Sequence, residues 1–155
     1  MLENSECYGI AISTFERIRA AFPALTMNLN LHPEHVDLAM DIPAQPGLSF
    51  HMHLNLQNLD ELHLSASALW VEWFPCTNPK KVEKYIDAVS GLLSGQFRIL
   101  EYWRGSRPVK AKLQRPGNGG WETVATSSVL LSIPWPPKSR KVVRNLPAVE
   151  PSQST

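Results

Sequence analysis

Residues 48–74 read LSFHMHLNLQNLDELHLSASALWVEWF, and this stretch decides the fold. In residues 48–57, and again from residue 62 onward, every second side chain is apolar, which is the period of a β-strand with one buried face. Residues 58–61 separate the two runs with the polar side chains of a turn. A hairpin that pairs about Leu59 places the polar side chains on one face and the apolar ones on the other. The stretch therefore predicts an antiparallel sheet with one solvated face.

The flanking sequence predicts two helices and further strands. Residues 5–22 repeat apolar side chains at a period near 3.6, as expected of an amphipathic helix. Thr77 or Asn78 is a suitable N-cap for a second helix that has Pro79 at its first position and Gly95 as its C-cap. We expect helices over residues 5–22 and 79–94, and strands over residues 27–31, 36–42, 48–57, 62–74, 97–104, 108–114 and 121–133.

The order of the predicted elements is α-β-β-β-β-α-β-β-β, and its short connections favour antiparallel neighbours. We therefore expect an α+β fold in which residues 1–135 form a single domain, a curved antiparallel sheet of about seven strands with both helices on one face. Residues 136–155 are rich in proline and basic, which predicts an extended or disordered tail. At the level of the fold alone, this order resembles that of bacterial interaction proteins such as secretion chaperones and toxin-neutralising immunity proteins.

The composition is that of an ordinary globular chain, but its charge is divided unevenly. The 155 residues are 43% hydrophobic and 19% charged, which excludes collagen-like, coiled-coil and wholly disordered chains. The net charge of +1 conceals nine acids and two bases in residues 1–77, against thirteen bases and five acids in residues 78–155. A function for this chain has to account for the opposite charges of its halves.

The sequence also bears on the compartment. Residues 1–6 carry two glutamates and no basic segment followed by an apolar one, so we expect no secretion signal. No window approaches the ~18 uninterrupted apolar residues that cross a bilayer. The two cysteines, Cys7 and Cys76, are too few for a disulfide framework or a cysteine zinc site. We expect a cytoplasmic protein that does not interact with membranes.

The five histidines all lie between residues 32 and 63 and define one candidate site. In the predicted hairpin His51 and His53 share the polar face with His63 of the neighbouring strand. Glu61, two residues before His63, is expected on the same face. Three imidazoles and a carboxylate are a ligand set for zinc or iron. The alternatives are a solvated sheet face, which we favour and which requires no cofactor, and a pH-sensitive interface.

A second candidate lies at the end of the same stretch. If residues 62–74 form one strand, Leu69, Val71 and Trp73 continue the polar face of His63 and make both faces of the strand apolar there. Such a strand has to be covered by the first helix, by a second subunit or by a partner. We expect these side chains to contribute to partner binding.

A third candidate is the basic second half. Between residues 97 and 144 there are ten bases and two acids. Arg98, Tyr102 and Arg104 share one face of their predicted strand, and Lys110 and Lys112 share one face of the next. Interleaved aromatic and basic residues are also found in single-strand nucleic-acid binders, but a pI near 7.8 argues against that function. We instead expect this surface to meet an acidic protein partner or the acidic half of a second copy.

No phosphate-binding, dinucleotide-binding or serine-hydrolase motif occurs in the sequence. Our first hypothesis is therefore a small protein-binding module of interaction or regulatory type, without catalytic activity, that forms a homodimer. The second is a metal-binding protein or metal-dependent enzyme that uses the histidine cluster. The third, which we consider unlikely, is nucleic-acid binding through the basic half.

Overall fold

The computed structural model describes residues 6–129 and 139–145 of the chain. Within these residues the fold is α+β, as the sequence predicts, with two helices and antiparallel sheets. The elements in chain order are α1 (Glu6–Ala21), β1 (Asn28–Asn30), β2 (Leu38–Ile42), β3 (Met52–Gln57), β4 (Glu61–Ala66), β5 (Leu69–Trp73), α2 (Pro79–Ser94), β6 (Arg98–Arg104), β7 (Arg107–Gly117), β8 (Gly120–Ser128) and β9 (Ser139–Val143).

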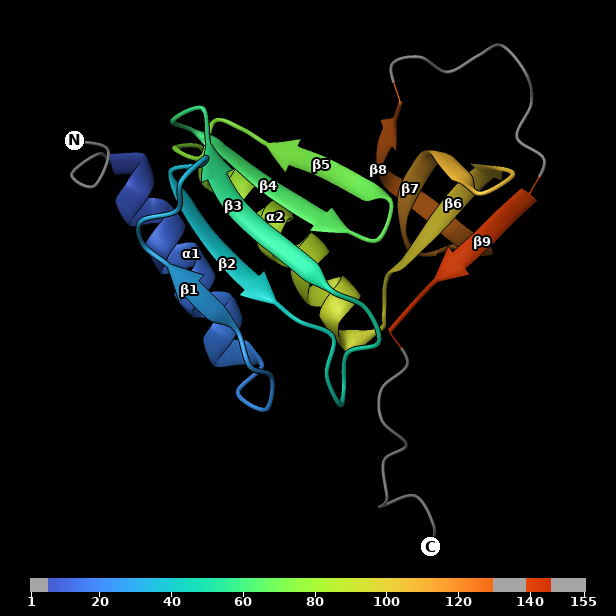
Figure 1. The fold of residues 1–155 in the computed structure, drawn as a ribbon, viewed down its shortest axis with the longest axis horizontal. Helices are drawn as coiled ribbons and strands as arrows, with labels where there is room; N and C mark the ends of the chain where they lie inside the picture. The colour runs from blue at the N-terminus through green and yellow to red at the C-terminus, as the bar shows by residue number, and fades with distance from the viewer. Residues whose placement is uncertain (1–5, 130–138, 146–155) are drawn as a thin grey trace, which may run out of the picture.

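The strands form two sheets, which corrects our expectation of one curved sheet of about seven strands (Figure 1). The first sheet has the order β1-β2-β3-β4-β5, and the second has the order β8-β7-β6-β9. After α2, strands β6, β7 and β8 pair with one another across short turns at Gly105 and Gly119, which both have positive φ. Because β6 is paired on both edges, with β7 and with β9, it has no free edge with which to extend the first sheet at β5.

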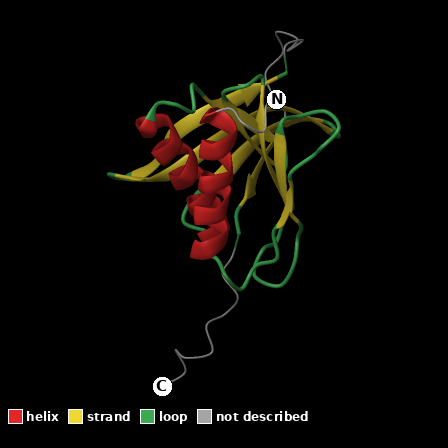
Figure 2. Cartoon of the chain, turned by 90° about the vertical axis from the view of Figure 1, so that its left-hand side faces the viewer, coloured by secondary structure: helices red, strands yellow, loops and turns green. Residues whose placement is uncertain are grey.

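Both helices cover the same face of the first sheet (Figure 2). Phe15 and Ile18 of α1 and Tyr85 and Val89 of α2 are completely buried against it. The ends of α2 are as predicted, since the Asn78 side chain accepts a hydrogen bond from the first turn and Gly95 adopts a φ of 81°. Every second side chain of strands β2 to β5 completes this core: Leu38, Met40, Ile42, Met52, Leu54, Leu56, Leu62, Leu64, Ala66, Leu69, Val71 and Trp73.

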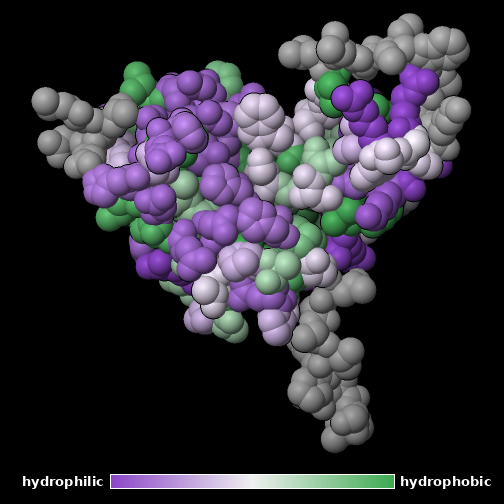
Figure 3. Space-filling view, viewed as in Figure 1, coloured by the Kyte–Doolittle hydropathy of each residue, from purple (hydrophilic) through white to green (hydrophobic). Residues whose placement is uncertain are grey.

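The predicted hairpin at Leu59 is confirmed by the register of β3 and β4. His53 lies opposite Ser65, and Asn55 lies opposite His63, so the polar side chains share the face of the first sheet that the helices leave uncovered. Hydrophilic residues cover much of this face (Figure 3). The alternation in the sequence therefore fixes both the pairing and the solvated side.

The single strand predicted over residues 62–74 is wrong. The segment forms β4 and β5, joined by a turn in which Ser67 has a left-handed φ of 51°. Two turn residues without pairing partners shift the alternation, so Leu69, Val71 and Trp73 point to the helices instead of continuing the polar face. They belong to the core, and no strand that is apolar on both faces results.

A buried carboxylate joins the second sheet to the first. Glu101 of β6 is 0% exposed, and its Oε2 accepts hydrogen bonds from the Ser67 hydroxyl at 2.6 Å and from the Ala68 N–H at 2.8 Å. Its Oε1 accepts a third from the Trp103 indole at 3.1 Å. Ile99 of the same strand is buried in the common core. The turn between β4 and β5 is therefore fastened to the second sheet by polar contacts as well as by packing.

The end of the described chain is fastened as well. Residues 139–143, within the segment where we expected an extended or disordered tail, form β9 and pair with β6. Asn145 follows and is 1% exposed. Its amide group donates to the carbonyls of Gly47 and Leu93 at 2.8 and 2.6 Å, and its oxygen accepts from the Ser49 N–H at 3.0 Å. The rest of the predicted tail lies outside the described residues.

Candidate functional site

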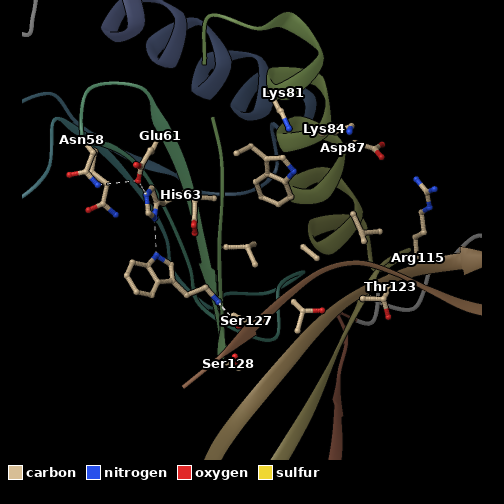
Figure 4. A pocket seen from close by; sticks show the side chains of 18 residues that line it. Asn58, Glu61, His63, Lys81, Lys84, Asp87, Arg115, Thr123, Ser127 and Ser128 are labelled. Carbon is tan, nitrogen blue, oxygen red and sulfur yellow. Dashed lines mark hydrogen bonds and ion pairs between the residues drawn. The ribbon is translucent and has the colours of Figure 1, made fainter. Parts of the chain in front are cut away.

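A cleft of about 920 Å³ lies between β5 and β8, which meet at Trp70 and Ser127, and α2 runs along one side of it (Figure 4). Its floor includes Val71 and Trp73, which are largely buried, and its rim includes Trp70, which is 57% exposed. Its lining comes from both sheets and from α2: Gln57, Asn58, Glu61, His63, Trp70, Val71, Glu72, Trp73, Lys81, Lys84, Asp87, Arg115 and residues 123–128.

The strands on both sides of the cleft are edge strands. In the described part of the chain β5 pairs only with β4, β8 pairs only with β7, and no backbone hydrogen bond joins β5 to β8. The Trp70 N–H points away from β4 and toward β8, since it donates to the Ser127 hydroxyl at 3.3 Å. Successive N–H groups of a strand point to opposite edges, so the N–H of Glu72, two residues after Trp70, points to the same edge. The cleft therefore exposes backbone groups of β5 that have no strand partner.

A chain of hydrogen bonds forms one wall of the cleft. The indole Nε1 of Trp70 donates to Nδ1 of His63 at 3.0 Å, and Nε2 of His63 lies 2.9 Å from Oε1 of Glu61. An indole N–H can only donate, so Nδ1 of His63 is the acceptor and Nε2 carries the hydrogen that faces Glu61. Asn58 also donates to Glu61 at 3.0 Å. The bonds from Asn58 and His63 lower the pKa of Glu61.

The structure does not bring the predicted metal ligands together. His51 and His53 both contact Oδ1 of Asp41, at 2.5 and 3.5 Å, while His63 and Glu61 contact each other at the cleft. Both ring nitrogens of His63 are already engaged, which leaves it no lone pair for a metal. Among the described residues no group of three or more His, Cys, Asp or Glu side chains is placed to hold a metal ion.

Charged side chains of both signs line the cleft. Lys81, Lys84 and Asp87 lie on α2 (Figure 4), and Glu61 and Glu72 belong to the first sheet. Arg115 of β7 also lines the cleft, where its guanidinium pairs with the exposed Glu122 at 3.3 Å. An occupant would thus meet two ammonium groups and one carboxylate on the α2 side, and carboxylates on the side of the first sheet.

The predicted partner-binding residues fall into separate places. Leu69, Val71 and Trp73 lie in the core, and of these Val71 and Trp73 also form the floor of the cleft. Arg104 lies beyond a bulge in β6, at the end of that strand. The others share the outer face of the second sheet with further residues of the basic half. We call this surface the basic face and define it as Arg98, Tyr102, Lys110, Lys112, Trp121, Arg140 and Arg144.

Sequence reasoning missed Trp70, which it placed on the apolar side of the long predicted strand. The signal that could have found it is Ser67 followed by Ala68, since two small residues inside a strand pattern are consistent with a turn. Sequence reasoning noted Trp121 among the aromatic residues of the basic half but did not include it in the partner-binding set, because only the pairing of β6, β7 and β8 brings that ring beside Arg98.

Comparison of the chain with protein-family models, with curated proteins and with solved structures finds no match. Within the described residues no helix is both long and apolar enough to span a membrane.

Proposed function

We propose that this protein is a protein-binding module that takes an extended segment of a partner into the cleft, where the segment adds as a strand to the edge of β5. The proposal rests on β5 being an edge strand that faces a cleft of about 920 Å³ and whose outward N–H groups have no strand partner among the described residues, only the Ser127 hydroxyl at Trp70. Another polypeptide backbone is the ligand that satisfies a row of alternating N–H and C=O groups. Strand addition supplies affinity through the backbone, and side-chain pockets supply specificity.

The side chains around the cleft support the same proposal. The exposed ring of Trp70 offers an apolar contact of the kind that dominates protein interfaces. On the α2 side the ammonium groups of Lys81 and Lys84 outnumber the carboxylate of Asp87 and favour acidic side chains in the segment. On the other side Glu61 and Glu72 favour basic ones. Both ring nitrogens of His63 are hydrogen-bonded to neighbouring side chains, so its ring is held in a fixed position and supports a structural role in the wall of the cleft.

The experiment is a selection from a displayed library of random decapeptides, followed by binding measurements on two variants at one position. Glu72→Pro removes the outward N–H without touching the β4 ladder, since proline is tolerated at such an edge position. Glu72→Thr removes the same charge and keeps the N–H. We expect selected peptides to bind the parent and Glu72→Thr equally, and Glu72→Pro at least tenfold more weakly. If no peptide is enriched, or if Glu72→Pro binds as well as Glu72→Thr, the proposal is wrong.

A further inference from the structure

We propose that the basic face is a second binding surface, separate from the cleft, and that its ligand is an acidic segment of another protein. The pairing of the second sheet gathers its cations on one side. Tyr102 lies opposite Lys110 on one neighbouring strand and opposite Arg140 on the other, and Leu100 lies opposite Lys112. Side chains of directly paired residues project from the same side of a sheet. Four strands of the chain thus contribute to one positively charged surface.

The cations of this face are held in place by its aromatic rings. The guanidinium of Arg98 lies 4.3 Å from the centre of the Trp121 ring, and that of Arg144 lies 5.2 Å from it. The ammonium groups of Lys110 and Lys112 each lie 5.6 Å from the centre of the Tyr102 ring. Such cation–π contacts restrict long side chains before a ligand arrives, which lowers the entropic cost of binding.

Hydrogen bonds fix the two arginines further. Nε of Arg98 donates to the side-chain oxygen of Gln114 at 2.9 Å, and Gln114 itself is 7% exposed. Nε of Arg144 donates to the carbonyl of Gly95, at the C-terminus of α2, at 2.6 Å. In each case the remaining guanidinium N–H groups are left to bind a carboxylate, for which their planar geometry is suited.

No carboxylate of the described residues neutralises the basic face. Of the two acids in the second sheet, Glu101 is buried on the opposite side, where it binds the turn at Ser67, and Glu122 pairs with Arg115. The ion pairs found in the described part of the chain include none with a cation of this face. The positive charge of the second half is thus directed outward, and its complement is an acidic ligand.

The ring geometry favours an acidic polypeptide over a nucleic acid. Sheet-based binders of single strands stack bases on open aromatic faces beside their cations. Here cations already lie over the rings of Trp121 and Tyr102. The whole-chain pI near 7.8 is also below the value above 9 that is usual for nucleic-acid-binding domains. Carboxylates need only the cations, so their binding leaves the ring contacts intact.

The test uses the full chain and poly-L-glutamate as the probe, with a poly-dT oligonucleotide of equal charge as its competitor. Lys110→Gln/Lys112→Gln removes two cations of the basic face. Lys80→Gln/Lys141→Gln removes the same charge elsewhere, from α2 and from β9. Lys141 lies opposite Glu101 in the register of β9 and β6, so its side chain is on the side of the sheet away from the basic face. At low salt we expect the first pair to weaken polyglutamate binding about tenfold and the control pair to change it less than twofold.

Three results would overturn the proposal. One is that polyglutamate does not bind at low salt or binds both double variants equally. Another is that poly-dT binds more tightly than polyglutamate, which would make the face a nucleic-acid site. The third is salt-sensitive self-association, seen by sedimentation and lost in Lys110→Gln/Lys112→Gln, which would make the acidic ligand a second copy of this chain. Because Glu72→Pro leaves the basic face intact, polyglutamate binding by that variant separates this proposal from the one for the cleft.

Discussion

Replacing Glu101 with glutamine tests the contact that fastens the second sheet to the first. The carboxylate accepts two hydrogen bonds on one oxygen, from Ser67 and Ala68, and one on the other, from Trp103. Glutamine keeps the shape but turns one oxygen into a donor. At least one buried donor then faces another donor, whichever way the amide is oriented.

The magnitude follows from the hydrogen bonds that each substitution removes. A hydrogen bond to a charged acceptor contributes about 1.5–3 kcal/mol, and leaving its buried donor unsatisfied costs about 1–3 kcal/mol. Removing the buried charge relieves part of its desolvation penalty. We therefore expect Glu101→Gln to lower the free energy of unfolding by about 2–3 kcal/mol. Glu101→Ala leaves all three donors unmatched and opens a cavity, so we expect about 4 kcal/mol. Ser67→Ala removes only the hydrogen bond from the Ser67 hydroxyl, so we expect it to lower the free energy of unfolding by about 1 kcal/mol.

The assay is urea unfolding of each variant, followed by tryptophan fluorescence and far-UV circular dichroism. The matched control is Glu122→Gln, which neutralises a carboxylate of the same sheet in an exposed ion pair and should change the free energy by less than about 0.5 kcal/mol. If Glu101→Gln is as stable as this control, packing alone joins the sheets and the reasoning fails.

Three further outcomes are expected. A Cβ at Gly91 would lie 2.3 Å from the Phe97 ring, so Gly91→Ala should lower the melting temperature, with an overpacking cost of about 1–3 kcal/mol. Burial raises the pKa of the Cys76 thiol to about 12, so in the native protein this cysteine should react with a thiol reagent only at the rate of unfolding, which mass spectrometry of labelled peptides measures. The hydrogen bond from Asn58 is the main cause of the lowered folded-state pKa of Glu61. The stability that this hydrogen bond contributes is therefore present at neutral pH and is lost as the pH falls through that pKa. Asn58→Gly should raise the pKa in an NMR titration, and its stability deficit should disappear in acid; an unchanged titration would contradict the assignment.

The parts of the fold that the sequence predicts are those governed by local patterns. Helix α2 has a capping residue, a proline and a glycine at fixed offsets, and each acts within one turn. The hairpin of β3 and β4 has an uninterrupted alternation on both sides of Leu59. The prediction failed at Ser67 because alanine and serine fit either face of a strand. Two small residues, Ser67 and Ala68, mark the point where the alternation shifts, but they fit a continuous strand as well as a turn.

The candidate sites depend on contacts between distant segments, and here the sequence was less informative. Alternation placed Lys110 and Lys112 on one face of their strand, and the structure agrees. It could not place Trp121 beside Arg98, because that contact depends on how β6, β7 and β8 pair. The cleft itself results from the division into two sheets, which no single strand encodes.

The second sheet is attached to the rest of the protein at three separate points, and this restricts how it can move. Phe97 packs against α2 at the start of β6, Glu101 holds the turn at Ser67, and Asn145 binds the carbonyls of Gly47 and Leu93 after β9. Hinge opening of the cleft would break buried hydrogen bonds. A ligand of the cleft would therefore meet a rigid, preformed slot, with association limited by encounter and orientation and not by a preceding conformational step.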